Sequence, residues 1–223
     1  MAGGPTASMM WTRMPGQSWA GAAASFVAMW TAMMAVMMLP SLVPTLHRYR
    51  VAMGGTGATR AGALTALVAF GYFAVWSALG AAVFPLGAAL AVAQMRLPMV
   101  ARAVPVATGV VVLLASAVQF TAWKAHHLAR GRLAAGEMHA LPASAGIAWR
   151  RGVCLGIHCS YGCAGLTAGL LVLGVMDLRV MAAVTAAITA ERLAPAGARV
   201  ARAIGGVGIV AGALLLARAV GSG

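Results

Sequence analysis

Long apolar runs alternate with short polar or proline-containing stretches along most of this chain. About 30 Å of hydrocarbon requires roughly 20 residues at a rise of 1.5 Å each, so runs of about this length predict transmembrane helices. The pattern therefore predicts an all-α fold, a polytopic transmembrane helical bundle of about six spans joined by short loops. The predicted spans are approximately residues 19–46, 61–84, 103–123, 152–175, 178–193 and 200–217.

The rest of the chain organisation follows from these spans. Residues 1–18 are expected to form an extramembrane N-terminal segment, followed by a single bundle over residues 19–220. The run 178–193 is the shortest, and a tilted or partly inserted helix is the alternative there. We find no internal repeat and no domain boundary.

Prolines and polar residues between the apolar runs predict where one span ends and the next begins. Pro85, Pro98 and Pro105 are expected to interrupt the chain between the second and third spans. Residues 124–151 form the longest polar stretch and predict a loop with at most one short amphipathic piece.

Composition and charge support a membrane protein. The chain is 62% hydrophobic and 9% charged, whereas a soluble domain carries roughly 25% charged residues. Its net charge of +13 comes from basic residues that flank apolar runs, so we expect the lipid bilayer rather than nucleic acid as the partner. Eleven of the sixteen basic residues fall in the first, third and fifth loops. The positive-inside rule then predicts that both termini lie outside the plasma (inner) membrane.

The fourth predicted span carries the most distinctive side chains. All three cysteines lie within ten residues, together with one histidine. At 100° per residue Cys154 and His158 share one face, and Cys159 and Cys163 share the adjacent face. Thiolates supported by imidazole or thioether favour Cu(I) or Zn(II). The alternative is that these cysteines are small apolar residues at a helix packing face.

The first predicted span is rich in methionine. Met33 and Met37 lie on one ridge of this helix, and Met34 and Met38 lie on the next. Stacked thioethers suit Cu(I), although methionine is also an ordinary packing residue in apolar helices.

Polar residues lie at the C-terminal ends of two other predicted spans. Glu191 could pair with Arg192, bind a metal or accept a proton. Lys124, His126 and His127 are most simply interpreted as interfacial anchors, and at most one of the two histidines faces the bundle.

The predicted topology places candidate groups from four helices at one depth. Residues 33–41, 119–127 and 154–159 and Glu191 all fall in the cytoplasmic half of the bundle. We therefore expect them to converge.

Five motifs that occur in order carry a family resemblance. They are Trp30-x-x-Met33-x-x-x-Met37-Met38-Leu39-Pro40-Ser41, Gln119-x-Thr121-x-x-Lys124, Gly156-x-x-Cys159-x-x-x-Cys163, Gly174-Val175-Met176 and Glu191-Arg192-Leu193-x-Pro195. Over roughly residues 25 to 215 the chain resembles a bacterial family of predicted metal-binding integral membrane proteins. The resemblance implies a membrane fold and metal binding.

Two departures from that family's pattern concern its cysteines. His127 and Gly131 stand where the family's Lys-x-x-Cys-Leu-x-x-Cys-Arg run has its two cysteines. The family's Cys-x-Gly-Cys-Cys-Trp run becomes Cys159-Ser160-Tyr161-Gly162-Cys163-Ala164 here, without one cysteine and the tryptophan. The resemblance thus implies a site with fewer sulfur ligands than in the family.

These observations favour a membrane protein that binds a soft metal for delivery, uptake or cuproenzyme assembly. Copper is the expected metal ion and zinc the alternative. The expected ligands are thiolates, a supporting imidazole, a thioether relay and a carboxylate that closes the site. They are Cys159 and Cys163, His158, the four methionines Met33, Met34, Met37 and Met38, and Glu191.

A non-catalytic structural or accessory subunit of a larger membrane enzyme complex is the alternative. The pairs Gly165/Gly169 and Gly208/Gly212 would permit close contact with partner subunits. An enzyme is less favoured, because the sequence shows no Ser–His–Asp set, no phosphate loop and only three acidic residues.

Overall fold

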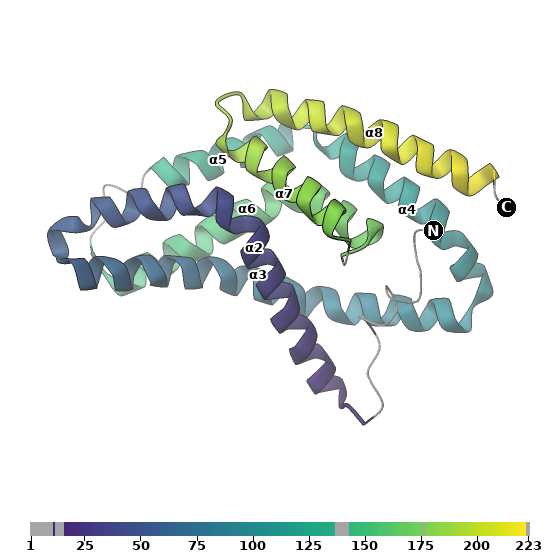
Figure 1. Cartoon of the computed structure of the whole chain (residues 1–223), viewed down its shortest axis with the longest axis horizontal. Coiled ribbons are helices and arrows are strands. Elements are labelled where there is room, and N and C mark those ends of the chain that lie inside the picture. The colour runs from purple at the N-terminus through teal and green to yellow at the C-terminus, as the bar shows by residue number, and fades with distance from the viewer. Residues whose placement is uncertain (1–10, 12–15, 137–142, 176, 222–223) are drawn as a thin grey trace.

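The computed structural model describes residue 11 and residues 16–136, 143–175 and 177–221. Over these residues it is all-helical, which confirms the predicted fold class (Figure 1). The elements are α2 (Trp19–Ala52), the short 3₁₀ turn η1 (Gly54–Thr56), α3 (Ala58–Arg96), α4 (Pro98–Val118), α5 (Ala122–Gly136), α6 (Ala145–Leu173), α7 (Leu178–Leu193) and α8 (Gly197–Gly221). Most of the predicted N-terminal segment 1–18, and Met176 of the fourth motif, lie outside the described residues.

Among the described helices, five are long and apolar enough to cross a membrane: α2, α3, α4, α6 and α8. The sequence predicted about six spans. The difference is α7, which has the bounds predicted for the fifth span but contains 16 residues. It therefore rises only about 24 Å, short of the roughly 30 Å hydrocarbon layer. The orientation with both termini outside requires an even number of crossings and stays a prediction.

Of the three prolines expected to interrupt the chain, Pro98 coincides with the break between α3 and α4, and the other two do not interrupt a helix. Pro85 lies inside α3 and Pro105 inside α4, so both helices continue through them. Pro98 occupies the first turn of α4, where its missing N–H costs no helical hydrogen bond. Membrane helices tolerate internal proline because neighbouring groups satisfy the freed carbonyls. At 39 residues α3 is about 58 Å long, almost twice the hydrocarbon thickness.

The predicted loop 124–151 is also largely helical. Residues 122–136 form α5, because alanine, leucine, lysine and arginine are good helix formers even without a continuous apolar face. The Ser144 side chain caps α6 by accepting a hydrogen bond from Ile147 N at 3.4 Å. The connection between the two helices therefore covers only residues 137–144.

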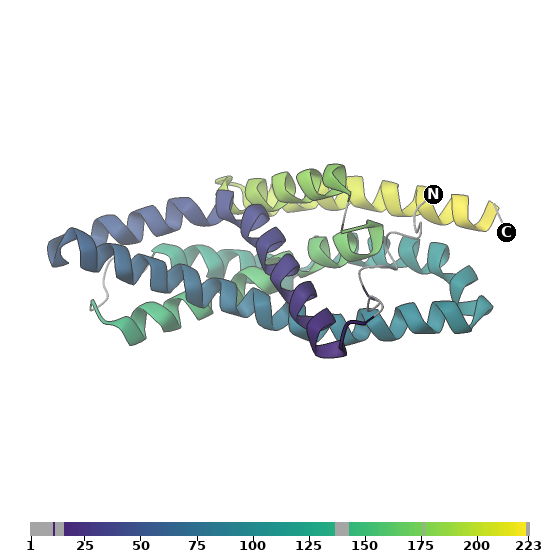
Figure 2. The same cartoon turned by 60° about the horizontal axis from the view of Figure 1, so that its bottom comes forward.

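The main helix contacts are α3 with α6 and α4 with α8, and both pairs run side by side in the two views (Figures 1 and 2). Glycine permits the first contact: a Cβ added to Gly71 would lie 2.7 Å from the Trp149 carbonyl oxygen, and one added to Gly152 would collide with the Val68 carbonyl. The two backbones thus touch, and α6 has a fixed position against α3.

The second contact occupies the small-residue face of α8. A Cβ at Gly212 would meet Leu113 of α4, and one at Gly208 would collide with the Ser116 side chain. This face therefore packs inside the chain. Gly165 of α6 likewise lies against the Ala115 carbonyl of α4.

Helix α2 changes direction midway along its length (Figure 1), and Pro40 and Pro44 lie within it. Its N-terminal half crosses α3, where Trp30 Nε1 donates to the Trp76 carbonyl at 3.0 Å. The absence of a side chain at Gly80 makes room for the Trp30 indole. This crossing fixes the face of α2 that carries Met34, Met37 and Met38 into the core.

Candidate metal site

Two sulfur atoms meet where α2 and α6 approach each other. Cys159 Sγ lies 3.8 Å from Met38 Sδ, although the two residues are 121 positions apart. Cys159 is 4% exposed and Met38 is fully buried. Helix packing has therefore placed a thiol and a thioether in contact away from solvent.

Two strong donors point at the same thiol sulfur. Tyr72 of α3 donates its hydroxyl to Cys159 Sγ at 2.9 Å, and Arg192 Nη1 of α7 donates at 2.9 Å. A sulfur that accepts from a phenol and a guanidinium is held as an electron-rich acceptor, as a thiolate would be. The site thus favours the form of cysteine that binds metals.

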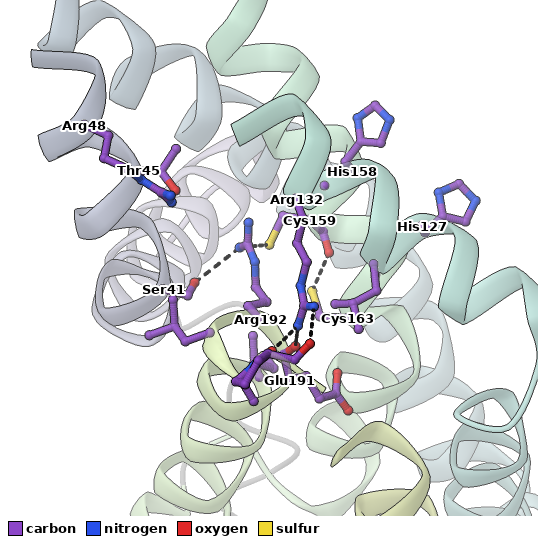
Figure 3. Close-up of a pocket in the computed structure, with 17 residues that line it drawn as sticks. Ser41, Thr45, Arg48, His127, Arg132, His158, Cys159, Cys163, Glu191 and Arg192 are labelled. Atoms are coloured by element: carbon purple, nitrogen blue, oxygen red, sulfur yellow. Dashed lines mark hydrogen bonds between the residues drawn. The ribbon is translucent and has the colours of Figure 1, made fainter. Parts of the chain in front are cut away.

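Arg192 is the central cation of this group. Besides Cys159, its Nη1 lies 3.2 Å from Ser41 Oγ (Figure 3). It also lies 3.4 Å from the Tyr72 hydroxyl. Burial acts to lower the pKa of Arg192, but Cys159, Tyr72 and Cys163 together outweigh it, and the net pKa is above that of a free arginine. Arg192 therefore stays charged, although the sequence analysis assigned it only as a partner for Glu191.

Cys163 lies one turn beyond Cys159 on the same face of α6, as predicted. It is 3% exposed, and its Sγ donates to the Cys159 carbonyl at 2.9 Å. Thr167 Oγ1 is 3.8 Å from this sulfur. Both thiols line one cavity of about 320 Å³, which Ser41 and Glu191 also border.

Glu191 is held in a buried polar group. Its Oε2 lies 2.6 Å from Lys124 Nζ, and its Oε1 accepts from Gln119 Nε2 at 2.8 Å. Lys124 also donates to the Gly162 carbonyl of α6. Burial raises the pKa of Glu191, and the Lys124 ammonium opposes that rise. The interpretation of Lys124 as an interfacial anchor is wrong: its side chain is 3% exposed because it neutralises this carboxylate.

Arg132 of α5 holds the C-terminal end of α7. Its guanidinium donates to the carbonyls of Glu191 at 2.9 Å, Ala194 at 2.5 Å and Pro195 at 3.2 Å. Terminal carbonyls of a helix lack intrahelical partners and carry partial negative charge, so an arginine stabilises them. Arg132 thereby fixes the backbone that presents Arg192 to the thiols.

The imidazole rings of His158 and His127 point away from the two buried thiols. His158 Nδ1 contacts the Cys154 carbonyl at 2.8 Å and Cys154 Sγ at 3.5 Å, which confirms the predicted Cys154/His158 face. Figure 3 shows the rings of His158 and His127 directed away from Cys159 and Cys163. Burial, followed by the positive charges nearby, lowers the pKa of His127. Neither His158 nor His127 therefore turns its ring toward Cys159, although both border the same cavity.

The predicted ligands do not all meet. Met38 contacts Cys159, Cys159 and Cys163 line one cavity, and Met34 and Met37 are buried in the core. Met33 is partly buried on the neighbouring ridge, Glu191 is engaged with Lys124, and His158 is turned outward. Among the described residues, no three His, Cys, Asp or Glu side chains are grouped closely enough to hold a metal ion. A soft-metal site with three or more protein ligands among these residues would therefore need a thioether.

The expected convergence of four segments is confirmed. Side chains from α2, the α4–α5 junction, α6 and α7 meet within hydrogen-bonding distance of Cys159 or Glu191. Sequence reasoning missed Tyr72. One signal could have found it, since a hydroxyl in an apolar span requires a hydrogen-bonding partner.

Comparison with known proteins decides the family. The family model described as PpoB2, copper chaperone, matches residues 27–215. This chain belongs to that copper chaperone family. The matched region contains Met38, Tyr72, Cys159, Cys163 and Arg192, and membership supports a copper-related function. No curated protein and no solved structure matches the chain.

Proposed function

We propose that this protein is a membrane-embedded chaperone that binds Cu(I) and delivers it to a copper-requiring partner. The single observation that carries the proposal is the 3.8 Å contact between Cys159 Sγ and Met38 Sδ. Family membership and five helices long and apolar enough to cross a membrane support it.

The separation of the two sulfurs suits a shared ion. With metal–sulfur bonds of about 2.3 Å, as in zinc thiolates, sulfurs 3.8 Å apart would subtend an angle of about 110° at the metal. Cys163 lies one turn away on the same cavity and could complete a three-sulfur set after a rotation of its side chain. A thioether among the ligands favours Cu(I) over zinc.

The cavity provides a path to these sulfurs. It extends from Cys159 and Cys163 past Thr45 to Arg48, whose side chain is exposed. At about 320 Å³ it is roughly ten times the volume of one water molecule, so a ligated copper ion can approach the thiols. Copper is the cargo in this scheme and leaves by the same route.

Glu191 has a supporting role in this proposal rather than that of a ligand. Both of its carboxylate oxygens are engaged, one by Lys124 and one by Gln119. The carboxylate joins α7 to the α4–α5 junction and so keeps Arg192 beside Cys159.

Copper binding by variants tests the proposal. Protein purified in detergent, kept reduced and free of oxygen, would be loaded with Cu(I) or Zn(II), and bound metal counted per chain. We expect about one Cu(I) in the native protein and in Cys154→Ser, background copper in Cys159→Ser, and a strong preference for Cu(I) over Zn(II).

Equal copper in the native protein and in Cys159→Ser would overturn the proposal. Background copper in both, with a stoichiometric membrane partner in the same preparation, would favour the accessory-subunit function instead. X-ray absorption of the copper protein should show sulfur neighbours, and fewer of them in Met38→Leu.

A further inference from the structure

Arg192 lies against the thiol sulfur that would bind copper in the proposed function. Its Nη1 lies 2.9 Å from Cys159 Sγ, on the sulfur that also contacts Met38 at 3.8 Å. A guanidinium and a cuprous ion carry the same single positive charge. Both cannot stay against one thiolate in a buried site without strong mutual repulsion.

We propose that Arg192 is an exchangeable counter-cation, which leaves Cys159 when Cu(I) binds and returns when Cu(I) is released. This inference rests on the proposed function. On loading, the bond between Cu(I) and a donor thiolate and the Arg192–sulfur hydrogen bond break, and a Cu(I)–sulfur bond to Cys159 forms; on release the reverse occurs while a thiolate of the acceptor takes the ion. No electron or proton changes place, and the thiolate has one cationic partner in each state.

The surroundings of Arg192 allow this movement. The guanidinium borders the cavity of about 320 Å³ and is only partly buried. Ser41 Oγ at 3.2 Å and the Tyr72 hydroxyl at 3.4 Å can keep accepting its hydrogen bonds after it leaves the sulfur. Because Arg132 holds the backbone at the end of α7, the exchange requires rotation of the Arg192 side chain alone.

The exchange has a kinetic consequence. Without a cation to replace copper, release would leave an uncompensated thiolate in a buried site, which is unfavourable. With Arg192 present, the empty site is already neutralised. Arg192 therefore speeds the release of copper to an acceptor.

Release kinetics test this inference directly. Cu(I)-loaded native protein, Arg192→Gln and Arg192→Lys would be mixed with an excess of a chromogenic Cu(I) chelator. We expect Arg192→Gln to release copper about tenfold more slowly and Arg192→Lys within about threefold of the native rate, because affinity differences appear mainly in dissociation. Cys154→Ser, a substitution outside the contacts of Cys159 and Arg192, serves as the control and should release copper at the native rate.

A second measurement uses the native protein and avoids any folding defect of a variant. An arginine-specific dicarbonyl should modify Arg192 several-fold faster after Cu(I) loading, as judged by mass spectrometry. Arg132, which keeps its carbonyl partners in both states, serves as the internal reference.

The outcomes separate the two proposals. Copper that binds through Cys159 but leaves Arg192→Gln at the native rate or faster would overturn this inference alone. Equal slowing in Arg192→Lys, or unchanged modification of Arg192 after loading, would do the same. Absence of Cys159-dependent copper would overturn the proposed function and this inference together.

Discussion

Lys124 Nζ lies 2.6 Å from Glu191 Oε2 in an ion pair whose side chains are 3% and 2% exposed. Removing either charge leaves the other buried and unpaired, so Lys124→Met or Glu191→Leu should cost about 3–5 kcal/mol of stability. Melting of the protein in detergent, followed by tryptophan fluorescence, would show the loss.

The double variant Lys124→Met/Glu191→Leu is the control for that prediction. It removes both charges and should melt well above either single variant, because replacing a buried pair by apolar residues is often close to neutral. A single variant that melts at the native temperature would contradict the burial of this pair.

The methionine pair Met38 and Met34 offers a matched test of the copper ligand. Both are fully buried on α2 one turn apart, but Cys159 Sγ is in contact with Met38. Met38→Leu should weaken Cu(I) affinity at least about tenfold, and Met34→Leu should leave it nearly unchanged. Competition with a Cu(I) chelator measures both, and equal weakening would remove Met38 as a ligand.

The contact between α3 and α6 predicts strong sensitivity at one glycine. In Gly152→Ala the new methyl group would collide with the Val68 carbonyl, and the strain should cost about 1–3 kcal/mol. Gly169→Ala on the same helix is the control, since its methyl group would meet no atom within 4 Å. If both variants melted alike, the close backbone approach would be refuted.

Burial also predicts the order in which the cysteines react. Cys154 is partly exposed, whereas Cys159 and Cys163 are 4% and 3% exposed. Under native conditions a water-soluble maleimide should modify Cys154 first, with the other two protected until the protein unfolds. Mass spectrometry of time points resolves the three sites, and early modification of Cys159 would contradict its burial.

The sequence predicted the features that depend on local pattern. Apolar runs located every long helix, and α7 has the predicted bounds, because hydropathy and length report directly on solvent preference. Helical spacing also placed Cys159 and Cys163 on a common face. Residues 122–136 were predicted as part of a loop with at most one short amphipathic piece, and the full extent of α5 was missed because their low apolar content resembles that of a loop.

Which side chains Glu191 and Arg192 pair with could not be predicted in the same way. Glu191 and Arg192 are adjacent, yet successive helical residues point about 100° apart. Glu191 therefore meets Lys124 and Gln119, while Arg192 turns to Cys159 on the other side. Such pairings are set by how separate helices pack.

The glycine contact that joins α3 and α6 determines what can move during copper transfer. Tyr72 and Cys159 belong to these two helices, so neither can shift along the other without backbone collision. The Cys159 thiol and the Tyr72 hydroxyl that donates to it are therefore held in fixed positions relative to each other. Opening and closing the site is therefore left to the Arg192 side chain at the end of α7.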